Sequence, residues 1–253
     1  MSVSPSMISP VEYLDQTGYN VAGYAAQALQ DWRSLAATLD HALLHPAATS
    51  NDVIRLCEEA SRYRFACVAV NPCWTALAHS ALAGTGIAVG AVIGFPFGAS
   101  LTRAKREEAD SVLRLGAREL DMVMNIGALK SGDYATVRGD VHALVELAHD
   151  AGAILKIVLE TCLLTMEEKL RACEICIAAG VDFVGTSTGF STEGATAEDV
   201  SLLRGVAGGR CGVLASGGIE SLHAVRAMLE TGASRVATCC GALIMQSYGA
   251  PTM

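Results

Sequence analysis

The chain has 253 residues, 51% of them hydrophobic, and a formal net charge of −8 at neutral pH. A chain of this length can bury a large core, and its acidic charge without a Lys/Arg cluster argues against nucleic-acid or anionic-lipid partners. The first thirty residues lack a basic start followed by an apolar stretch, as a signal peptide would have. No later segment has an uninterrupted apolar run long enough to span a membrane. We therefore expect a cytoplasmic protein that acts on a small molecule.

The chain begins with a leader over residues 1–30, after which short runs of Val, Ile and Ala alternate with amphipathic stretches. This alternation is typical of βαβ units and a parallel sheet. The predicted strands are Leu35–Leu39, Ala66–Val70, Ala88–Ile93, Glu119–Met124, Ile154–Leu159, Phe183–Thr186, Gly212–Ala215 and Arg235–Thr238. The predicted helices lie near Asn51–Arg62, Trp74–Leu82, Leu101–Leu115, Asp133–Ala151, Thr165–Ala179, Ala197–Val206 and Ser221–Thr231.

These strand–helix units would suit either an open, doubly wound sheet or a closed barrel. A doubly wound nucleotide-binding sheet carries a Gly-x-Gly-x-x-Gly turn after its first strand, and nothing in this chain resembles that turn. We therefore predict an α/β protein with one domain, a (β/α)8 TIM barrel over residues 31–253. The reactive groups of such barrels lie at the C-terminal ends of the strands.

The segments that close the predicted strands form an ordered series of motifs. They are Asp40-His41-Ala42-Leu43-Leu44, Val70-Asn71-Pro72-Cys73, Ile93-Gly94-Phe95-Pro96, the run Glu119–Gly132, Lys156–Thr161, Thr186-Ser187-Thr188-Gly189-Phe190 and Ser216-Gly217-Gly218-Ile219. This series, from about Leu35 to Gly241, closely resembles the deoxyribose-phosphate aldolases. The resemblance implies a (β/α)8 barrel and a cytoplasmic enzyme, often a homo-oligomer, that uses a lysine to form an iminium with an aldehyde. We expect no cofactor.

Two lysines of that mechanism have no counterpart in this chain. The resemblance places the iminium-forming lysine directly before Thr-Ser-Thr-Gly, where this chain has Gly185. A second lysine, which lowers the pKa of the first by charge proximity, corresponds to Leu214. Since neither glycine nor leucine carries a side-chain nitrogen, we predict that the aldolase mechanism does not carry over unchanged.

A further departure concerns the substrate phosphate. The family's pair of small hydroxyl residues, which helps to bind that phosphate, is replaced by Cys239 and Cys240. A thiol is a weaker hydrogen-bond donor than a hydroxyl, so we expect weakened phosphate binding. The backbone N–H groups of Gly189, Gly217 and Gly218 offer an alternative cradle for an anion.

Side chains alternate in direction along a strand, so one inward position fixes the others. Asp121 matches the family's proton-handling aspartate, which places Asn125 inward too, and the same alternation places Lys156 and Glu160 inward. With Asp40 from the first strand, the interior then holds three carboxylates, and Lys156 is the evident counter-charge. We predict that one carboxyl has a raised pKa suited to acid–base catalysis.

The resulting site prediction gives each residue a role. Asp121 is the proton carrier, Lys156 an electrophile or relocated nucleophile, Glu160 the group that holds this lysine, and Asp40 a further catalytic carboxyl. The predicted substrate-binding residues are Asn71, Asn125, Thr186, Ser187, Thr188, Gly189, Ser216, Gly217, Gly218, Cys239 and Cys240. The alternative is a purely structural network in which Lys156 pairs with one carboxylate and Asn71, Asn125 and Thr186 satisfy the others.

No metal site is predicted. His41 and His45 have the i, i+4 spacing that suits a metal on a helix, but they fall in a predicted loop, where the spacing guarantees nothing. Cys173 and Cys176 match half of a zinc site without a second pair. We interpret the cysteines as reduced and mostly buried.

Three functions remain open at this point. The first is a diverged enzyme that acts on a small carbonyl or enol substrate, phosphorylated or not, by acid–base catalysis on a proton or a carbon–carbon bond. The second is a ligand-binding barrel without catalysis. The third is a true deoxyribose-phosphate aldolase that uses Lys156 in place of the missing lysine. Function depends on the site, because one fold hosts many chemistries.

Overall fold

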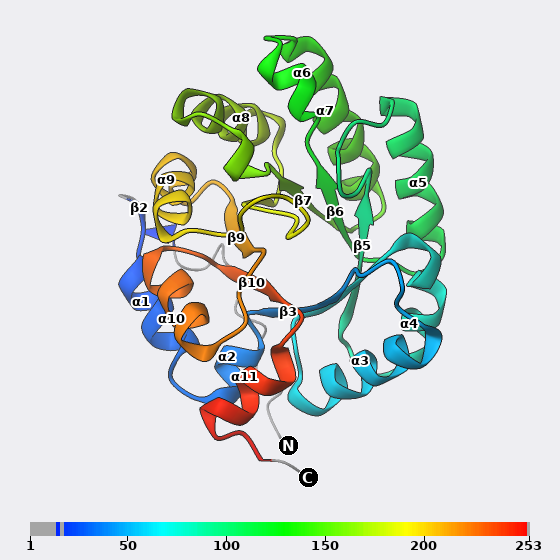
Figure 1. Cartoon of the computed structure of the whole chain (residues 1–253), viewed down its shortest axis with the longest axis vertical. Helices are drawn as coiled ribbons and strands as arrows, with labels where there is room; N and C mark the ends of the chain where they lie inside the picture. The colour runs from blue at the N-terminus through cyan, green and yellow to red at the C-terminus, as the bar shows by residue number, and fades with distance from the viewer. Residues whose placement is uncertain (1–13, 16–17, 252–253) are drawn as a thin grey trace.

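The computed structural model describes residues 14–15 and 18–251. Eight parallel strands close into a barrel in the order β10-β3-β4-β5-β6-β7-β8-β9. The helices surround this barrel as an outer ring (Figure 1). The predicted (β/α)8 barrel is therefore confirmed.

The barrel strands agree with the predicted ones to within two residues, except for the first. They are β3 (Leu39–Leu43), β4 (Cys67–Val70), β5 (Ala88–Ile93), β6 (Glu119–Val123), β7 (Ile154–Val158), β8 (Phe183–Gly185), β9 (Gly212–Ser216) and β10 (Arg235–Thr238). The first strand was predicted at residues 35–39. It begins four residues later because the Asp31 side chain accepts hydrogen bonds from the Arg33 and Ser34 N–H groups and so starts a helix there.

The helices of the outer ring follow their strands in the expected alternation. They are α2 (Trp32–Ala36), α3 (Ser50–Tyr63), α4 (Thr75–Ala81), α5 (Thr102–Arg114), α6 (Ile126–Lys130), α7 (Tyr134–Asp150), α8 (Met166–Ala179), α9 (Ala197–Ala207), α10 (Leu222–Thr231) and α11 (Gly241–Tyr248). Capping boxes begin α3, with Thr49 and Asp52, and α8, with Thr165 and Glu168. Short 3-10 turns η2 (Pro72–Trp74) and η3 (Thr161–Leu163) precede α4 and α8. None of the described helices is long and apolar enough to cross a membrane.

The predicted leader contains an ordered helix. Helix α1 (Val21–Ala28) packs against α10, and the Tyr24 hydroxyl donates a hydrogen bond of 2.5 Å to the Ser234 carbonyl. Two short strands, β1 (Leu14–Asp15) and β2 (Gly18–Tyr19), pair antiparallel before it. The rest of the predicted leader, residues 1–13 and 16–17, lies outside the described residues.

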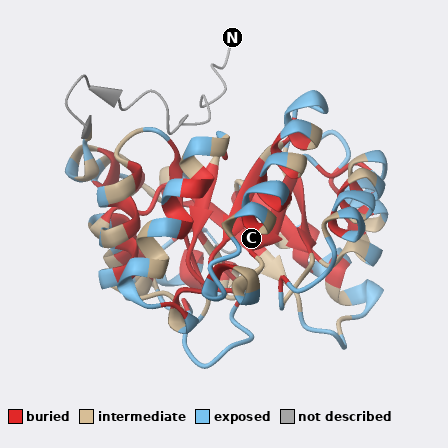
Figure 2. Cartoon of the chain, turned by 90° about the horizontal axis from the view of Figure 1, so that it is seen from above, coloured by how far each residue is buried: buried red, intermediate tan, exposed pale blue. Residues whose placement is uncertain are grey.

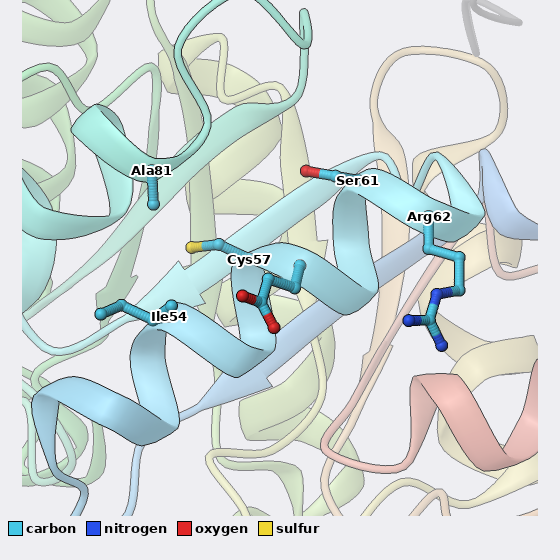
Figure 3. A pocket seen from close by; sticks show the side chains of 6 residues that line it. Ile54, Cys57, Ser61, Arg62 and Ala81 are labelled. Atoms are coloured by element: carbon cyan, nitrogen blue, oxygen red, sulfur yellow. The ribbon is translucent and has the colours of Figure 1, made fainter. Parts of the chain in front are cut away.

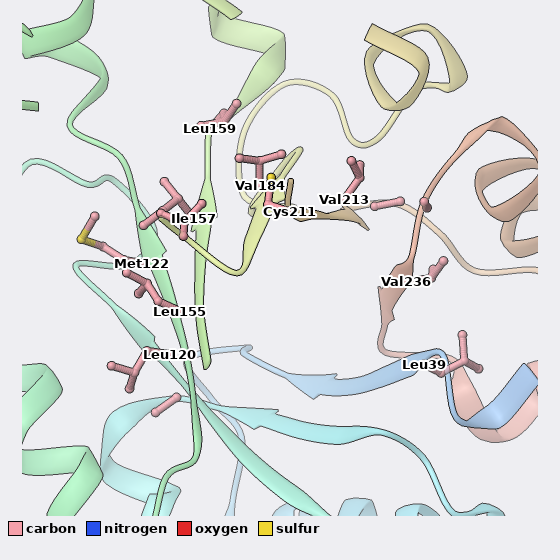
Figure 4. Close-up of a cluster of buried hydrophobic side chains, with 14 of the residues drawn as sticks. Leu39, Leu120, Met122, Leu155, Ile157, Leu159, Val184, Cys211, Val213 and Val236 are labelled. Carbon is pink, nitrogen blue, oxygen red and sulfur yellow. The ribbon is translucent and has the colours of Figure 1, made fainter. Parts of the chain in front are cut away.

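The main apolar core lies between the strands and the helices. Leu120, Met122, Leu155 and Ile157 point outward from β6 and β7 into this layer (Figure 4). Figure 2 shows buried residues in the centre of the molecule and exposed residues on the outer faces of the helices. Since the outward positions of each strand fill this core, the alternate positions face the barrel interior, where the site is built.

Candidate active site

An ion network fills the barrel interior beneath the C-terminal ends of the strands. Lys156 on β7 lies directly opposite Asp121 on β6, and its side chain is fully buried. Its Nζ lies 2.7 Å from an Asp40 oxygen, 2.6 Å from a Glu119 oxygen and 3.3 Å from Asp121 Oδ1. The prediction that Asp40, Asp121 and Lys156 face the interior is confirmed by these contacts.

Two members of this network were not predicted. Arg235, the first residue of β10, contacts both Asp40 and Glu119 with its guanidinium group. Glu119 lies two residues before Asp121 on β6, so strand alternation alone was sufficient to place it inward. The three carboxylates of the network, Asp40, Glu119 and Asp121, therefore face two cations, Lys156 and Arg235.

Because the network has more carboxylates than cations, the pKa values of its carboxyl groups differ. Burial raises the pKa of Glu119, but Arg235 and Lys156 outweigh it and hold that pKa at about 2. Burial also raises the pKa of Asp121, Lys156 lowers it only in part, and Asp40 and Glu119 raise it further, to about 6. For Lys156, the surrounding carboxylates overcome burial and raise its pKa well above the ordinary value. Asp121 is therefore the surplus carboxyl of the network.

A cavity of about 330 Å³ opens above Asp121 at the C-terminal ends of the strands. Its walls are mainly apolar, and the loops after β3, β5, β8, β9 and β10 contribute to its lining. The lining residues include Ala42, Ala69, Val92, Phe95, Asp121, Val158, Ser187, Thr188, Gly189, Phe190, Leu214, Ser216, Gly217, Gly218, Glu220, Ala237 and Cys239. The site therefore combines one buried titratable carboxyl with an apolar chamber, as expected for the active end of this fold.

The two positions at which the sequence resemblance predicted lysines lie together on the inner face of the barrel. Gly185 on β8 lies directly opposite Leu214 on β9, and Leu214 lines the cavity. A Cβ added at Gly185 would lie 3.5 Å from Leu214 Cδ2, an ordinary van der Waals contact. The backbone therefore tolerates a side chain at position 185, and the leucine occupies the neighbouring space.

The predicted role of Glu160 is wrong. It does not contact Lys156, because its backbone turns into the left-handed region (φ 55°) directly after β7. Its carboxylate instead accepts hydrogen bonds from the Thr188 hydroxyl, at 2.5 Å, and from the Thr188 N–H, at 3.3 Å. Backbone strain of this kind persists only where surrounding contacts hold it. Glu160 thus fixes the loop after β8 rather than the lysine.

The hydroxyl groups of the loops after β8 and β9 differ in whether they already form hydrogen bonds. Thr186 is fully buried and bonds the Ser216 backbone, so it joins β8 to β9 and does not line the cavity. The Ser216 hydroxyl donates to the Ser187 carbonyl at 2.7 Å. The Ser187 Oγ is buried, lies in a cavity-lining residue and has no hydrogen-bond partner among the described residues. It is therefore a buried hydroxyl without a hydrogen bond in the wall of the cavity.

Four predicted substrate-binding residues are not among those that line the cavity: Thr186, Cys240, Asn125 and Asn71. The Asn125 side chain accepts a hydrogen bond from the Ala128 N–H and caps α6, because β6 has already ended at Val123. The Asn71 side chain donates to the Leu44 carbonyl at 3.0 Å. One polar atom of each amide is therefore bonded to loop backbone, and their role in substrate binding stays a prediction.

The cysteines and histidines are distributed as follows. Cys239 lines the cavity rim, and its Sγ lies 3.7 Å from that of Cys240. His45 also lines the cavity, whereas His41 lies within β3 and points away, with its Nε2 at 2.7 Å from Glu59. The two histidines therefore do not form a pair. All nine cysteines are free thiols, and Cys67, Cys173 and Cys176 are buried as predicted.

Two other features do not add to the site. The ligand atoms of Asp40, Cys67 and Glu119 lie within 4.8 Å of one another, but Lys156 and Arg235 already neutralise this cluster. A second, open depression lies on the outer side of the helix ring and is lined by Ile54, Cys57, Ser61 and Arg62 of α3 and by Ala81 of α4 (Figure 3). It contains none of the residues of the interior network.

A closed (β/α)8 barrel with a buried titratable carboxyl beneath a C-terminal cavity is the architecture of a barrel enzyme. Residues 34–246 match the model of the DeoC/LacD family of aldolases. The chain is 50% identical to a deoxyribose-phosphate aldolase of Thermococcus gammatolerans over 214 residues, which cover 84% of this chain and 95% of the relative. A deoxyribose-phosphate aldolase of Bacillus mycoides is 48% identical over 212 residues, with the same coverage.

Solved structures agree with these relatives. The tetrameric deoxyribose-phosphate aldolase of Aeropyrum pernix superposes with a TM-score of 0.83 at 31% identity, covering 91% of this chain and 97% of that one. The chain therefore belongs to the DeoC/LacD aldolase family.

Proposed function

We propose that this protein is an enzyme that acts on a small carbonyl or enol substrate by acid–base catalysis on a proton or a carbon–carbon bond, without an iminium lysine. The observation that carries the proposal is Asp121: it faces the cavity, and its pKa is raised to about 6. A carboxyl with a pKa near the working pH is suited to general acid–base catalysis.

The chemistry follows from the two forms of Asp121. As a carboxylate, it accepts the proton from the carbon next to the carbonyl; the electron pair of the broken C–H bond forms the C=C bond, and the carbonyl π pair moves onto the oxygen as an enolate. The Ser187 hydroxyl is buried in the cavity wall and lacks a partner among the described residues, and in this proposal it turns to donate a hydrogen bond to that oxygen. The reverse step returns the proton from Asp121 to carbon.

The network beneath Asp121 supports this role in preference to a relocated lysine. Lys156 does not line the cavity, and three carboxylates raise its pKa, so that its amine keeps its proton at neutral pH. A protonated amine is not a nucleophile toward an aldehyde. We propose that Lys156 acts by charge, holding Asp121 in place and limiting the rise of its pKa.

Hydrogen–deuterium exchange tests the proposal directly. Small aldehydes and ketones in D2O are followed by proton NMR with the wild type, Asp121→Asn, and Asp150→Asn as a control on the exposed end of α7. The wild type and the control should exchange protons next to the carbonyl, and Asp121→Asn should be slower by roughly 10²–10⁴-fold. Equal rates in wild type and Asp121→Asn would contradict the proposal, and binding without exchange would favour the ligand-binding barrel.

We also propose that the protein forms a homo-oligomer. The related aldolase of Aeropyrum pernix is described as tetrameric, which supports this assembly. Several large hydrophobic side chains are exposed on the chain, with Phe97 at 77% and Leu101 at 71% both in the segment between β5 and α5. Sedimentation velocity would test the proposal, and a single monomeric species would contradict it.

A further inference from the structure

Two neighbouring thiols stand at the mouth of the cavity. Cys239 and Cys240 directly follow β10, and their Sγ atoms lie 3.7 Å apart. Cys239 is exposed and lines the cavity, and Cys240 is half-buried at the position before α11. Neither thiol takes part in the acid–base chemistry proposed above, so the pair is available for a separate role.

The backbone holds these two residues in place. The Cys240 N–H donates to the Thr238 hydroxyl oxygen at 2.9 Å, and that hydroxyl donates to the Ile219 carbonyl at 2.6 Å. The Cys240 carbonyl accepts a hydrogen bond from the Ile244 N–H at 3.0 Å and so starts α11. The segment is therefore anchored to the loop after β9 on one side and to a helix on the other.

The spacing of the thiols suits a shared metal ion better than a disulfide. Two thiolates on a tetrahedral zinc ion, each about 2.3 Å from the metal at an angle of about 109°, lie roughly 3.8 Å apart. The observed separation of 3.7 Å matches this value. A disulfide usually needs about 4.4–6.8 Å between its Cα atoms, whereas those of adjacent residues joined by a trans peptide are only about 3.8 Å apart. A disulfide between these residues would therefore be strained, whereas a metal ion requires little movement of either sulfur.

A carboxylate lies in the loop next to the thiols. Strand β9 neighbours β10 in the barrel, and the loop that follows β9 carries Glu220, which lines the same cavity. Burial, the Cys239 thiol and the Glu220 carboxylate together raise the pKa of Cys240 to about 11, so the carboxylate is within electrostatic reach of the pair. The Glu220 side chain is exposed, and so it can turn toward the two sulfurs.

The surroundings favour a cation with these three ligands. Among the described residues that line the cavity, none is Lys or Arg, and the carboxylates are those of Asp121 and Glu220. His45 lines the cavity from the other side of β10, but its Nδ1 accepts a hydrogen bond from the Ala47 N–H at 3.2 Å. We therefore do not count this histidine as a ligand. Two thiolates and one carboxylate are ligand types that zinc takes in proteins.

We propose that Cys239, Cys240 and Glu220 form a Zn²⁺-binding site at the mouth of the cavity. Both thiols lose their protons when the ion binds. The fourth position of a tetrahedral ion remains for a water molecule or for an oxygen of a ligand in the cavity. This site goes beyond the proposed function, because it concerns metal binding alone, and its test needs no turnover.

Titration of the reduced protein with Cd²⁺ tests the thiol pair, because Cd²⁺ binds at thiolate sites of zinc and absorbs in the ultraviolet when thiolates ligate it. The wild type should bind a single Cd²⁺ ion with such a band, and added Zn²⁺ should remove the band by competition. Cys239→Ser and Cys240→Ser should each weaken binding by at least about tenfold, and the double variant should lose the band. Cys73→Ser removes another exposed thiol and should change nothing.

Competition by Zn²⁺ in a further pair of variants tests the carboxylate. Glu220→Gln should weaken Zn²⁺ binding by at least about tenfold, and Glu230→Gln, at an exposed position of α10, should leave it unchanged. A wild type without a thiolate band in excess Cd²⁺ would overturn the proposal, as would a band of full strength in the double cysteine variant. Unchanged Zn²⁺ affinity in Glu220→Gln would overturn the three-ligand assignment.

Discussion

The protein buries two ion networks, and they differ in balance. Between α5 and α7, Lys105 Nζ lies 2.7 Å from Asp140 Oδ2 and donates to the Val123 carbonyl, while Thr102 donates to the other oxygen of Asp140. One cation meets one carboxylate, and each oxygen of that carboxylate accepts a hydrogen bond. In the barrel interior, three carboxylates meet two cations, and Asp121 faces a cavity.

Burial of a lysine does not by itself indicate a reactive site. Lys105 and Lys156 are equally inaccessible, so burial alone does not distinguish a structural ion pair from a reactive site. The difference lies in the surplus carboxylate and in its access to a cavity. A balanced buried pair holds its charges fixed, whereas a surplus carboxyl with a pKa raised toward neutrality can both accept and return a proton.

The largest expected effect concerns deoxyribose 5-phosphate. If positions 185 and 214 lack the nitrogen of the iminium mechanism, cleavage of this substrate should be slower than that of the Thermococcus or Bacillus relatives by roughly 10³-fold or more. A coupled assay of acetaldehyde release, with a relative as the positive control, measures it. Turnover at the relative's rate would show that another group supplies the nucleophile.

The next effect compares the two buried lysines. Lys156→Met and Lys105→Met should each destabilise the protein by about 3–5 kcal/mol, because each leaves buried carboxylate charge without its partner. Urea unfolding provides the measurement. In the folded variants, only Lys156→Met should move the pH midpoint of exchange activity upward, since Lys156 lowers the pKa of Asp121. An equal shift in Lys105→Met would contradict the distinction between the networks.

A smaller effect is expected in the pH dependence of stability. The pKa of Asp121 rises from 3.8 to about 6 on folding, so the folded state binds more protons between these values and loses stability as pH rises through them. Relative to Asp121→Asn, the wild type should therefore lose on the order of 2–3 kcal/mol between pH 4 and pH 7. Urea unfolding of both proteins across this range checks the prediction. Parallel pH curves would contradict it.

The barrel fold, and the residues that point inward from its regular strands, could be predicted from the sequence. Alternation placed Asp121 and Lys156 correctly, and the same rule would have added Glu119. It failed where a strand ended early: Asn125 caps a helix, and Glu160 turns into the left-handed region. Backbone direction beyond a strand depends on contacts with other elements, such as that of Glu160 with Thr188, which the local pattern does not contain.

Arg235 illustrates a second limit. Its inward direction follows from β10, but its partners Asp40 and Glu119 lie on β3 and β6, more than one hundred residues away in the chain. Charge balance inside a barrel depends on which inward residues reach one another across it. Asp40 pairs with both Lys156 and Arg235, whereas Asp121 contacts Lys156 alone among these cations, at 3.3 Å. This difference could be seen only in the three-dimensional structure.

Titration of Asp121 measures whether it is the surplus carboxyl of the barrel interior. Carbon-13 NMR of aspartate-labelled protein follows the Asp121 carboxyl, which is assigned by the signal missing from Asp121→Asn. We expect a midpoint near pH 6 in the wild type and a midpoint lower by about one pH unit or more in Leu214→Lys, which adds a cation to the lining of the same cavity. A wild-type midpoint at or below the ordinary value of 3.8 would contradict it.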